Sequence, residues 1–321
     1  MRYVEVGGVR LSVIGLGTWQ FGSREWGYGR EYADGAALEI TRKALDLGVN
    51  LIDTAEMYAF GQSERIVARA VAGRRSEAFL ATKVFPVFPI APVVEWRGRS
   101  SARRLGVDSI DLYQVHWPNP FVPDRTAMDG MRRLLEAGLV KHAGVSNYPL
   151  ERWRRAEADL GRPILSNQVQ YSLAVRKPDR DLVPHAGAND RLIIAYSPLA
   201  QGFLSARYDA TNVPGGVRAG NALFLPENLA RGAELLETLR SVAKAHDATP
   251  AQVALAWVVH HRNVVAIPGA SSVDQMVRNA EAGDLELSNE EMTELTAASD
   301  RFQPKGGLAA MPELVRNRFR R

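Results

Sequence analysis

Short apolar runs alternate along the chain with longer stretches in which apolar residues recur at helical spacing. Eight of the runs are apolar on both faces, as strands buried in a parallel sheet are. They cover residues 14–16, 51–53, 79–83, 112–116, 143–146, 165–169, 193–196 and 264–267. Parallel strands need long crossover connections, which are usually helices, so the pattern predicts an α/β fold.

The segments between these runs have the spacing of amphipathic helices. Residues 36–47 predict one helix, and a second should begin with Gln62 or Ser63 near its N-cap. Residues 229–245 predict a continuous helix late in the chain, and residues 289–298 predict a further one after the eighth strand. Eight strand-and-helix units in succession favour a closed (β/α)8 TIM barrel over an open doubly wound sheet.

Two segments fall outside this repeat. Gly7 and Gly8 separate two short β-like runs, and paired glycines suit the tight turn of an N-terminal β-hairpin. Residues 200–226 form a long irregular segment with several glycines and prolines, and we expect it to be a lid over the barrel mouth. No linker or shift in composition divides the chain, so we expect residues 1–321 to form a single domain.

Composition narrows the classes of protein that remain. The 321 residues include no cysteine, which excludes disulfides, thiol catalysis and cysteine-based metal sites, and we expect no metal. The net charge is +4, but basic residues are scattered among acids, apart from the tail at 315–321. Because they form no basic stripe, we expect no nucleic-acid partner. The start lacks an apolar leader and no run reaches about 18 apolar residues, so we expect a soluble, cytoplasmic protein without a membrane partner. The sequence leaves monomer and homo-oligomer open.

Four polar residues follow three neighbouring predicted strands. Asp53 ends the second strand, and Tyr58 follows it by five residues. Lys83 ends the third strand and His116 the fourth, each about one βα unit, or roughly 30 residues, after the previous one. We therefore expect these residues at one height around the C-terminal mouth, where barrel enzymes hold their chemistry.

These residue types suit an acid catalyst that protonates a carbonyl oxygen. An ammonium about 4 Å from a phenol favours the phenolate by about 4 kcal/mol at an effective dielectric near 20, so Lys83 should lower the pKa of Tyr58. Asp53 would keep Lys83 protonated, and a neutral His116 would donate a hydrogen bond to the substrate oxygen. A lysine beside an aspartate also suits Schiff-base chemistry, so an aldolase-like reaction stays open.

Six segments of the chain resemble the aldo-keto reductase family. They occur in order between about Val4 and Ala298 and read Gly15-Leu-Gly-Thr18, Ile52-Asp-Thr-Ala-Glu-Met-Tyr58, Leu80-Ala-Thr-Lys83, Arg104-Leu-Gly-Val-Asp108 with Ile110-Asp-Leu-Tyr-Gln-Val-His-Trp117, Gly144-Val-Ser-Asn147 and Ile267-Pro-Gly269. The resemblance implies an oxidoreductase that reduces aldehydes and ketones to alcohols with hydride from NADPH. It also implies a catalytic tetrad of Asp53, Tyr58, Lys83 and His116.

The resemblance further implies an extended NADP(H) bound without a Gly-rich dinucleotide fold, and no G-x-G-x-x-G follows any predicted strand. Ser146, Asn147 and Gln168 should hold the nicotinamide carboxamide, and Tyr196 should stack under the ring. Backbone N–H groups of residues 197–202 should wrap the pyrophosphate. The expected cofactor residues are Gly17, Thr18, Trp19, Ser146, Asn147, Gln168, Tyr196, Ser197, Pro198, Leu199, Gln201, Gly202, Ile267, Gly269, Ser271, Gln275, Arg278 and Asn279.

The segment after the eighth strand departs from the pattern of many members. Gly269 and Gln275 stand where those members carry a lysine and an arginine that grip the ribose 2′-phosphate. This pattern resembles the branch with potassium-channel β subunits and bacterial relatives, which take NADP(H). We therefore expect a modest preference for NADP(H), with NAD(H) as a second cofactor.

The substrate side is less specific. Four side chains are expected to line an apolar cup beside the tetrad: Trp19, Met57, Phe85 and Trp117. Such a cup suits aldehydes and ketones with an apolar body, and the sequence names no single one. A nucleotide-binding regulatory or scaffold subunit with weak turnover stays open as the alternative function.

Overall fold

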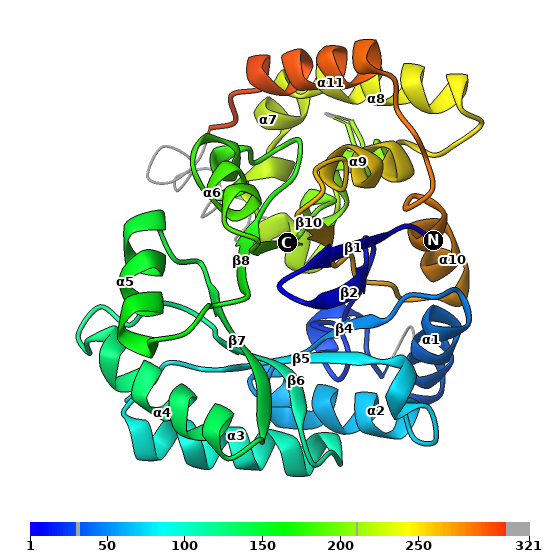
Figure 1. The fold of residues 1–321 in the computed structure, drawn as a ribbon. Helices are drawn as coiled ribbons and strands as arrows, with labels where there is room; N and C mark the ends of the chain where they lie inside the picture. The colour runs from blue at the N-terminus through cyan, green and yellow to red at the C-terminus, as the bar shows by residue number, and fades with distance from the viewer. Residues whose placement is uncertain (30–32, 210, 306–321) are drawn as a thin grey trace.

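The computed structural model describes residues 1–29, 33–209 and 211–305. Its centre is a sheet of eight parallel strands in the order β10-β9-β8-β7-β6-β5-β4-β3, surrounded by helices (Figure 1). The sheet closes on itself, because Gly15 N–H donates to Ala266 O (2.7 Å) and Ala266 N–H donates to Val13 O (2.9 Å). The predicted (β/α)8 barrel is thereby confirmed.

All eight predicted strands are present, each within about three residues of the expected bounds. Their side chains are buried on nearly every position, as expected of strands covered by helices outside and by core inside. The strands are β3 (Leu16–Gly17), β4 (Leu51–Asp53), β5 (Phe79–Val84), β6 (Ile110–Val115), β7 (Val140–Ser146), β8 (Ser166–Gln170), β9 (Leu192–Tyr196) and β10 (Val264–Ala266).

The helices form the outer layer of the barrel, and α8 and α11 pack against each other outside it. The further helix expected after the eighth strand is therefore confirmed as α11. The helices are α1 (Asp34–Asp46), α2 (Gln62–Ala70), α3 (Ala91–Leu105), α4 (Asp124–Glu136), α5 (Leu150–Leu160), α6 (Leu182–Ala188), α7 (Pro226–Arg231), α8 (Ala233–Ala245), α9 (Pro250–Val258), α10 (Val273–Glu281) and α11 (Asn289–Arg301). No described helix combines the length and apolar character that a membrane crossing requires.

One helix prediction is wrong in detail and another is confirmed. The helix expected over residues 229–245 is broken at Gly232, where a Cβ would lie 2.5 Å from the Phe203 ring, so the ring packs into the gap between α7 and α8. The helix expected to begin with Gln62 or Ser63 near its N-cap is α2, which begins at Gln62, directly after the left-handed N-cap Gly61. Ser63 lies inside the helix, and its hydroxyl donates to Thr18 O (3.0 Å).

One helix of the barrel was absent from the prediction, although its start signal is present. Thr249 and Gln252 form a capping box at the N-terminus of α9, with Pro250 in the first turn. The last six of the nine residues of α9 are buried, so its apolar positions show no helical periodicity.

The predicted hairpin, β1 (Tyr3–Val6) and β2 (Val9–Ser12), covers the N-terminal end of the barrel. Gly7 N–H donates to Asp190 Oδ2 (3.0 Å), and a Cβ at Gly7 would lie 2.4 Å from the Leu165 side chain. Leu165 directly precedes β8 and Asp190 lies two residues before β9, so the hairpin closes that end. The open mouth of the barrel is therefore the C-terminal one.

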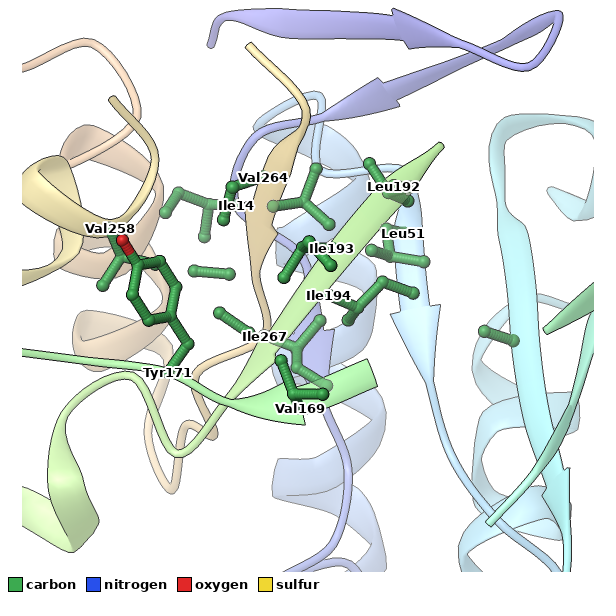
Figure 2. Close-up of a cluster of buried hydrophobic side chains, with 14 of the residues drawn as sticks. Ile14, Leu51, Val169, Tyr171, Leu192, Ile193, Ile194, Val258, Val264 and Ile267 are labelled. Atoms are coloured by element: carbon green, nitrogen blue, oxygen red, sulfur yellow. The ribbon is translucent and has the colours of Figure 1, made fainter. Parts of the chain in front are cut away.

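The barrel interior is filled by apolar side chains rather than hollow. Figure 2 shows side chains from the strands and their flanking segments meeting in one cluster, among them Ile14, Leu51, Ile193 and Val264, all of which are fully buried. Close packing of this kind holds the strand ends in fixed positions, which the site at the C-terminal mouth requires.

Candidate active site

A buried ion pair joins β4 and β5 near the C-terminal mouth. Lys83 Nζ lies 2.5 Å from Asp53 Oδ1, and the two side chains are 0% and 2% exposed. Lys83 Nζ also donates to Thr54 O (2.8 Å) and to Tyr58 Oη (3.3 Å). The expectation of equal height needs correction, because Asp53 lies opposite Ala81, two residues before Lys83. The long lysine side chain spans this offset.

The pair keeps Lys83 charged in spite of its burial. Burial alone would lower the pKa of Lys83, but the Asp53 carboxylate and the Tyr58 hydroxyl raise it above its ordinary value. Asp53 in turn accepts amide donors at Oδ2 from Gln168 Nε2 (2.8 Å) and Gln114 Nε2 (3.3 Å). Each charge in the interior is thus hydrogen-bonded on several sides, as a buried ion pair must be.

Tyr58 lies next to Lys83, yet the pKa of its phenol is raised above the ordinary value. Burial raises the pKa of the Tyr58 phenol, and this effect outweighs the lowering by Lys83, while Asp53 raises it further. The expectation of a lowered pKa for Tyr58 is therefore wrong in the net direction, since it considered the ammonium and not the burial. The phenol keeps its proton at neutral pH.

The chain directly after Tyr58 makes an unusual turn. Residues 59–61 have φ angles of 47°, 53° and 80°, so three consecutive residues are left-handed and two of them are not glycine. Such residues cost about 1–3 kcal/mol each and persist where surrounding structure holds them. Arg104 supplies part of that support, because its side chain packs against Gly61 and its Nε donates to buried Glu64 (2.5 Å).

A second arginine of α3 fixes the chain before Tyr58. Glu56 Oε1 accepts from Phe85 N–H (2.7 Å) and from Arg97 Nη1 (3.0 Å), and the same Nη1 donates to Phe85 O (2.6 Å). Burial raises the pKa of the Glu56 carboxyl, and the Phe85 N–H and Arg97 oppose that rise. Glu56 thereby joins the Tyr58 loop to the end of β5.

His116 lies beside Tyr58 in a form that carries no charge. Burial and the nearby Lys83 ammonium lower the pKa of His116 to about 2. Its ring stacks on Trp117 with ring centroids 3.8 Å apart, and the Tyr58 ring meets it edge-on at 6.0 Å. His116 Nδ1 is buried and has no hydrogen-bond partner among the described residues. A neutral imidazole here has one N–H with which to donate.

The residues expected to hold the nicotinamide carboxamide are close together at the ends of β7, β8 and β9. Ser146 Oγ donates to Gln168 O (2.8 Å), and Asn147 Nδ2 donates to Ser146 Oγ (3.0 Å). Asn147 is left-handed (φ 61°), and its Oδ1 accepts from Tyr196 Oη (2.9 Å). Gln168 Nε2 is bonded to Asp53, but no described residue donates to Gln168 Oε1. That oxygen is an available acceptor at the mouth.

The loop after β9 is compact and strained. It contains the short 3₁₀ helices η5 (Ala200–Ser205), η6 (Gly216–Gly220) and η7 (Ala222–Phe224). Ser197 and Gln201 have positive φ angles of 50° and 58°, so the chain turns sharply where the expected pyrophosphate residues lie. The roles of Ser197, Pro198, Leu199, Gln201 and Gly202 toward a cofactor remain predictions.

This loop is connected to the loop after β3 across the mouth. Arg218 Nε donates to Gln201 O (2.8 Å), and the Arg218 guanidinium lies 5.2 Å from the centre of the Trp26 ring. Trp26 in turn meets Trp19, with ring centroids 5.2 Å apart. The expected lid segment therefore contacts the loop after β3, and its role as a lid over the barrel mouth stays a prediction.

Gly17 and Thr18, expected at the cofactor, lie where β3 meets the segment after β10. Gly17 N–H donates to Pro268 O (3.0 Å), and a Cβ at Gly17 would lie 2.6 Å from Ile267 O. Only glycine fits this backbone approach. Thr18 is fully buried, and its hydroxyl donates to Asp53 O (2.9 Å), so its side chain faces the interior.

Besides Ile267, the segment after β10 carries five further expected cofactor residues: Gly269, Ser271, Gln275, Arg278 and Asn279. Gly269 O accepts from Asn279 Nδ2 (3.2 Å), and Gln275 Oε1 accepts from Ser271 N–H (2.9 Å), so these polar groups are bonded to one another. Arg278 is exposed and forms no ion pair with any described residue. Arg278 is therefore the cation of this segment that is free to meet an anion.

The four expected substrate residues lie on the loops after β3, β4, β5 and β6. Trp19, Met57 and Trp117 are exposed to between 41% and 47%. The Phe85 ring meets Trp117 edge-on at 5.6 Å and His116 at 6.5 Å. The structure thus brings Phe85 and Trp117 to His116, with Met57 next to Tyr58 in the chain.

Sequence reasoning missed two groups of this site. Gln114 donates to Asp53 and lies opposite Lys83 in the sheet, and Thr54 O accepts from Lys83. Gln114 precedes His116 by two residues and so shares its face of the strand, a signal that the period of two could have supplied. The backbone carbonyl of Thr54 leaves no such signal in a sequence.

Comparison with known proteins shows the family of this chain. The family model described as the aldo/keto reductase family matches residues 13–300. An uncharacterized oxidoreductase of Mycobacterium tuberculosis is 54% identical over 322 residues, covering 100% of both chains. Methylglyoxal reductase YeaE of Escherichia coli is 34% identical over 94% of this chain and 95% of its own length.

A solved structure supports the same assignment. An aldo/keto reductase from Klebsiella pneumoniae, in complex with NADP and acetate, has a TM-score of 0.75 and 31% identity, over 96% of this chain and 98% of that one. The fold and site define a barrel oxidoreductase of the NAD(P)H-dependent class. The chain belongs to the aldo/keto reductase family.

Proposed function

We propose that this chain reduces aldehydes and ketones to alcohols with hydride from NADPH, and that Tyr58 donates the proton. The observation that carries the proposal is the position of Lys83 Nζ, which contacts both the Asp53 carboxylate and the Tyr58 hydroxyl inside a barrel mouth. Asp53 holds Lys83 charged, and Lys83 faces the atom at which negative charge develops when Tyr58 releases its proton.

The direction of the Tyr58 pKa fits the role of an acid. A phenol whose pKa is raised stays protonated at neutral pH, so the proton is present when a substrate carbonyl arrives. The phenolate that remains after transfer lies next to the Lys83 ammonium, which stabilises it electrostatically. Neutral His116 has one N–H to donate to the same oxygen, and this bond would orient the carbonyl.

The residues present fit a nicotinamide cofactor. The carboxamide NH₂ of such a ring would find an acceptor at Gln168 Oε1, beside Ser146 and Asn147, and the Tyr196 ring is fixed by its bond to Asn147. Exposed Arg278 would meet a 2′-phosphate, which supports NADP(H) with NAD(H) as the second choice. When bound, this cofactor supplies the hydride, and the side chains described above supply orientation and the proton.

The experiment is a comparison of Tyr58→Phe with Tyr113→Phe. Tyr113→Phe is the matched control, because it also removes one tyrosine hydroxyl. Tyr113 is fully buried in β6, and its hydroxyl has no hydrogen-bond partner among the described residues. Tyr58→Phe should lose about 10²–10⁴-fold in turnover on an aldehyde panel, while keeping its affinity for NADPH. Tyr113→Phe should keep both.

Two outcomes would contradict the proposal. Turnover of Tyr58→Phe near that of the natural protein would show that another group donates the proton. Tight NADPH binding by the natural protein with negligible reduction of every carbonyl in the panel would favour the regulatory or scaffold function instead.

A further inference from the structure

The exposed apolar side chains of this protein are gathered at one place. Nine large apolar side chains are exposed among the described residues, and eight of them lie on the loops that follow β3, β4, β5 and β6. Those eight are Trp19, Met57, Phe60, Val87, Phe88, Ile90, Trp117 and Phe121, and the ninth, Trp96, lies on α3. The loops after four adjacent strands thus carry eight of the nine exposed large apolar side chains, on the side of the mouth that holds Tyr58.

Five of these eight residues lie outside the predicted substrate cup. Four of the five are on the loops after β5 and β6 and form what we call the outer apolar surface: Val87, Phe88, Ile90 and Phe121. Phe88 and Phe121 are 74% and 91% exposed. Residues 84–94 and 117–123, which carry the outer apolar surface, contain no charged residue. Contiguous apolar surface without charge is rare on soluble proteins and usually marks a binding site.

Prolines and hydrogen bonds hold these loops in place. The two segments contain six prolines, which restrict their backbone. Asn119 Nδ2 donates to Pro86 O (2.8 Å), and Thr126 Oγ1 donates to Pro89 O (3.1 Å), so the loop after β5 is bonded to the segment after β6. Phe88 is held in the left-handed region (φ 48°). The exposed rings are therefore presented by a preorganised surface.

This surface is continuous with the candidate acid. The loop after β5 begins at Phe85, whose N–H is bonded to Glu56 of the Tyr58 loop. The Phe85 ring contacts Trp117, and Trp117 stacks on His116. Glu56 is committed to Phe85 and Arg97, and Lys83 is buried against Asp53. The loops after β4, β5 and β6 contain no lysine or arginine that would pair with an anionic substrate.

We propose that the substrate is an uncharged carbonyl compound with an elongated apolar body, such as a long-chain alkyl or arylalkyl aldehyde. Its carbonyl lies at Tyr58 and His116, and its tail extends past Phe85 and Trp117 onto the outer apolar surface. This inference rests on the proposed function, and it specifies the class of substrate. The hydride and proton still go to the carbonyl carbon and oxygen, giving the corresponding alcohol.

A series of straight-chain aldehydes from about three to about ten carbons tests the inference. Each methylene that reaches apolar protein surface should raise kcat/KM by about two- to fourfold, until the tail passes the end of that surface. Phe88→Ser and Phe121→Ser should flatten the increase at the longer chains and leave the shortest aldehydes unchanged. Trp96→Ser is the matched control, since this exposed ring lies on α3, and it should leave the whole series unchanged.

A binding measurement separates this inference from the proposed function. Quenching of tryptophan fluorescence by straight-chain alcohols, titrated into the protein with NADPH bound, should show the same dependence on chain length and the same effect of the serine variants. If binding shows it but no aldehyde is reduced, the proposed function fails and the apolar site stands.

The inference itself is overturned by kcat/KM values that do not depend on chain length, or by a preference for short or carboxylate-bearing carbonyls, with reduction still observed. It is also overturned if Phe88→Ser and Phe121→Ser change only the sedimentation of the protein, because the outer apolar surface would then join two copies of the chain.

Discussion

Replacing Asp53 by asparagine tests the buried centre of the site most directly. Asp53 Oδ1 meets the Lys83 ammonium, and Oδ2 accepts amide donors from Gln168 and Gln114. Asparagine has one oxygen and one NH₂ group in these places. If the oxygen stays toward Lys83, the NH₂ group faces two amide donors, and no charge remains to pair with the ammonium. The variant keeps the shape of the natural side chain and removes its electrostatic role.

The magnitude follows from the burial of both partners. Removing one partner of a fully buried ion pair costs about 3–5 kcal/mol in the free energy of unfolding, because the other charge is left uncompensated. Lys83 is 0% exposed and would retain only uncharged acceptors, among them Thr54 O and Tyr58 Oη. We therefore expect Asp53→Asn to lose about 3–5 kcal/mol of stability at pH 7.

The loss should depend on pH with a definite sign. In the natural protein the pKa of Lys83 is raised, so its stabilising contribution is present up to the unfolded pKa of about 10.4 and is lost only above that. In the variant, burial without a carboxylate lowers the pKa of Lys83 below the unfolded value. The folded variant then binds fewer protons than the unfolded chain, so its stability rises with pH toward about 10.4. The deficit should therefore shrink between about pH 7 and about pH 10.

Urea unfolding of both proteins at several pH values measures this deficit. Asp111→Asn is the matched control, because Asp111 is also buried and bonded to a lysine, but that lysine, Lys141, is 55% exposed and regains water. The stability that Asp111→Asn loses relative to the natural protein should not shrink as pH rises. A deficit for Asp53→Asn that is under about 1 kcal/mol, or that is equal at both ends of the range, would refute the buried, charged Lys83 on which the argument depends.

Three further predictions concern activity. Because burial and Lys83 lower the pKa of His116 to about 2, kcat should be level from about pH 5 to about pH 8, and a step near pH 6.5 in the pH profile would contradict a neutral His116. Arg278→Gln should reduce the preference for NADPH over NADH by about 10- to 100-fold in nucleotide titrations, and an unchanged ratio would assign the 2′-phosphate to another group. Arg97→Met should lower kcat about tenfold and leave the affinity for NADPH unchanged, because Glu56 would lose the hydrogen bond that holds the Tyr58 loop. Loss of a hydrogen bond to a charged group costs about 1.5 kcal/mol, which corresponds to about tenfold in rate. Arg99→Met, on the exposed side of the same helix, is its control, and equal kcat values for the two variants would contradict the positioning role.

The sequence by itself determined the architecture and the identity of the chemical groups. Eight short apolar runs separated by helical stretches predict parallel strands, since strands in such a sheet are covered on both faces. Asp53, Lys83 and His116 end three successive strands, and in a barrel those ends meet at one mouth whatever the details of packing. Local rules were weaker where helices are buried all round, as in α9, or interrupted, as between α7 and α8.

Only the tertiary structure decided how these groups behave. Charge and spacing suggested that Lys83 acidifies Tyr58, but the pKa of Tyr58 depends on how deeply the phenol is buried, and burial has the larger effect. The supports from Gln114, Glu56 and Arg97 likewise come from segments up to 61 residues away, brought together by the pairing of β4, β5 and β6 and the packing of α3. Sequence separation carries no information on dielectric environment or on contacts across strands, because both arise when the chain excludes water and packs.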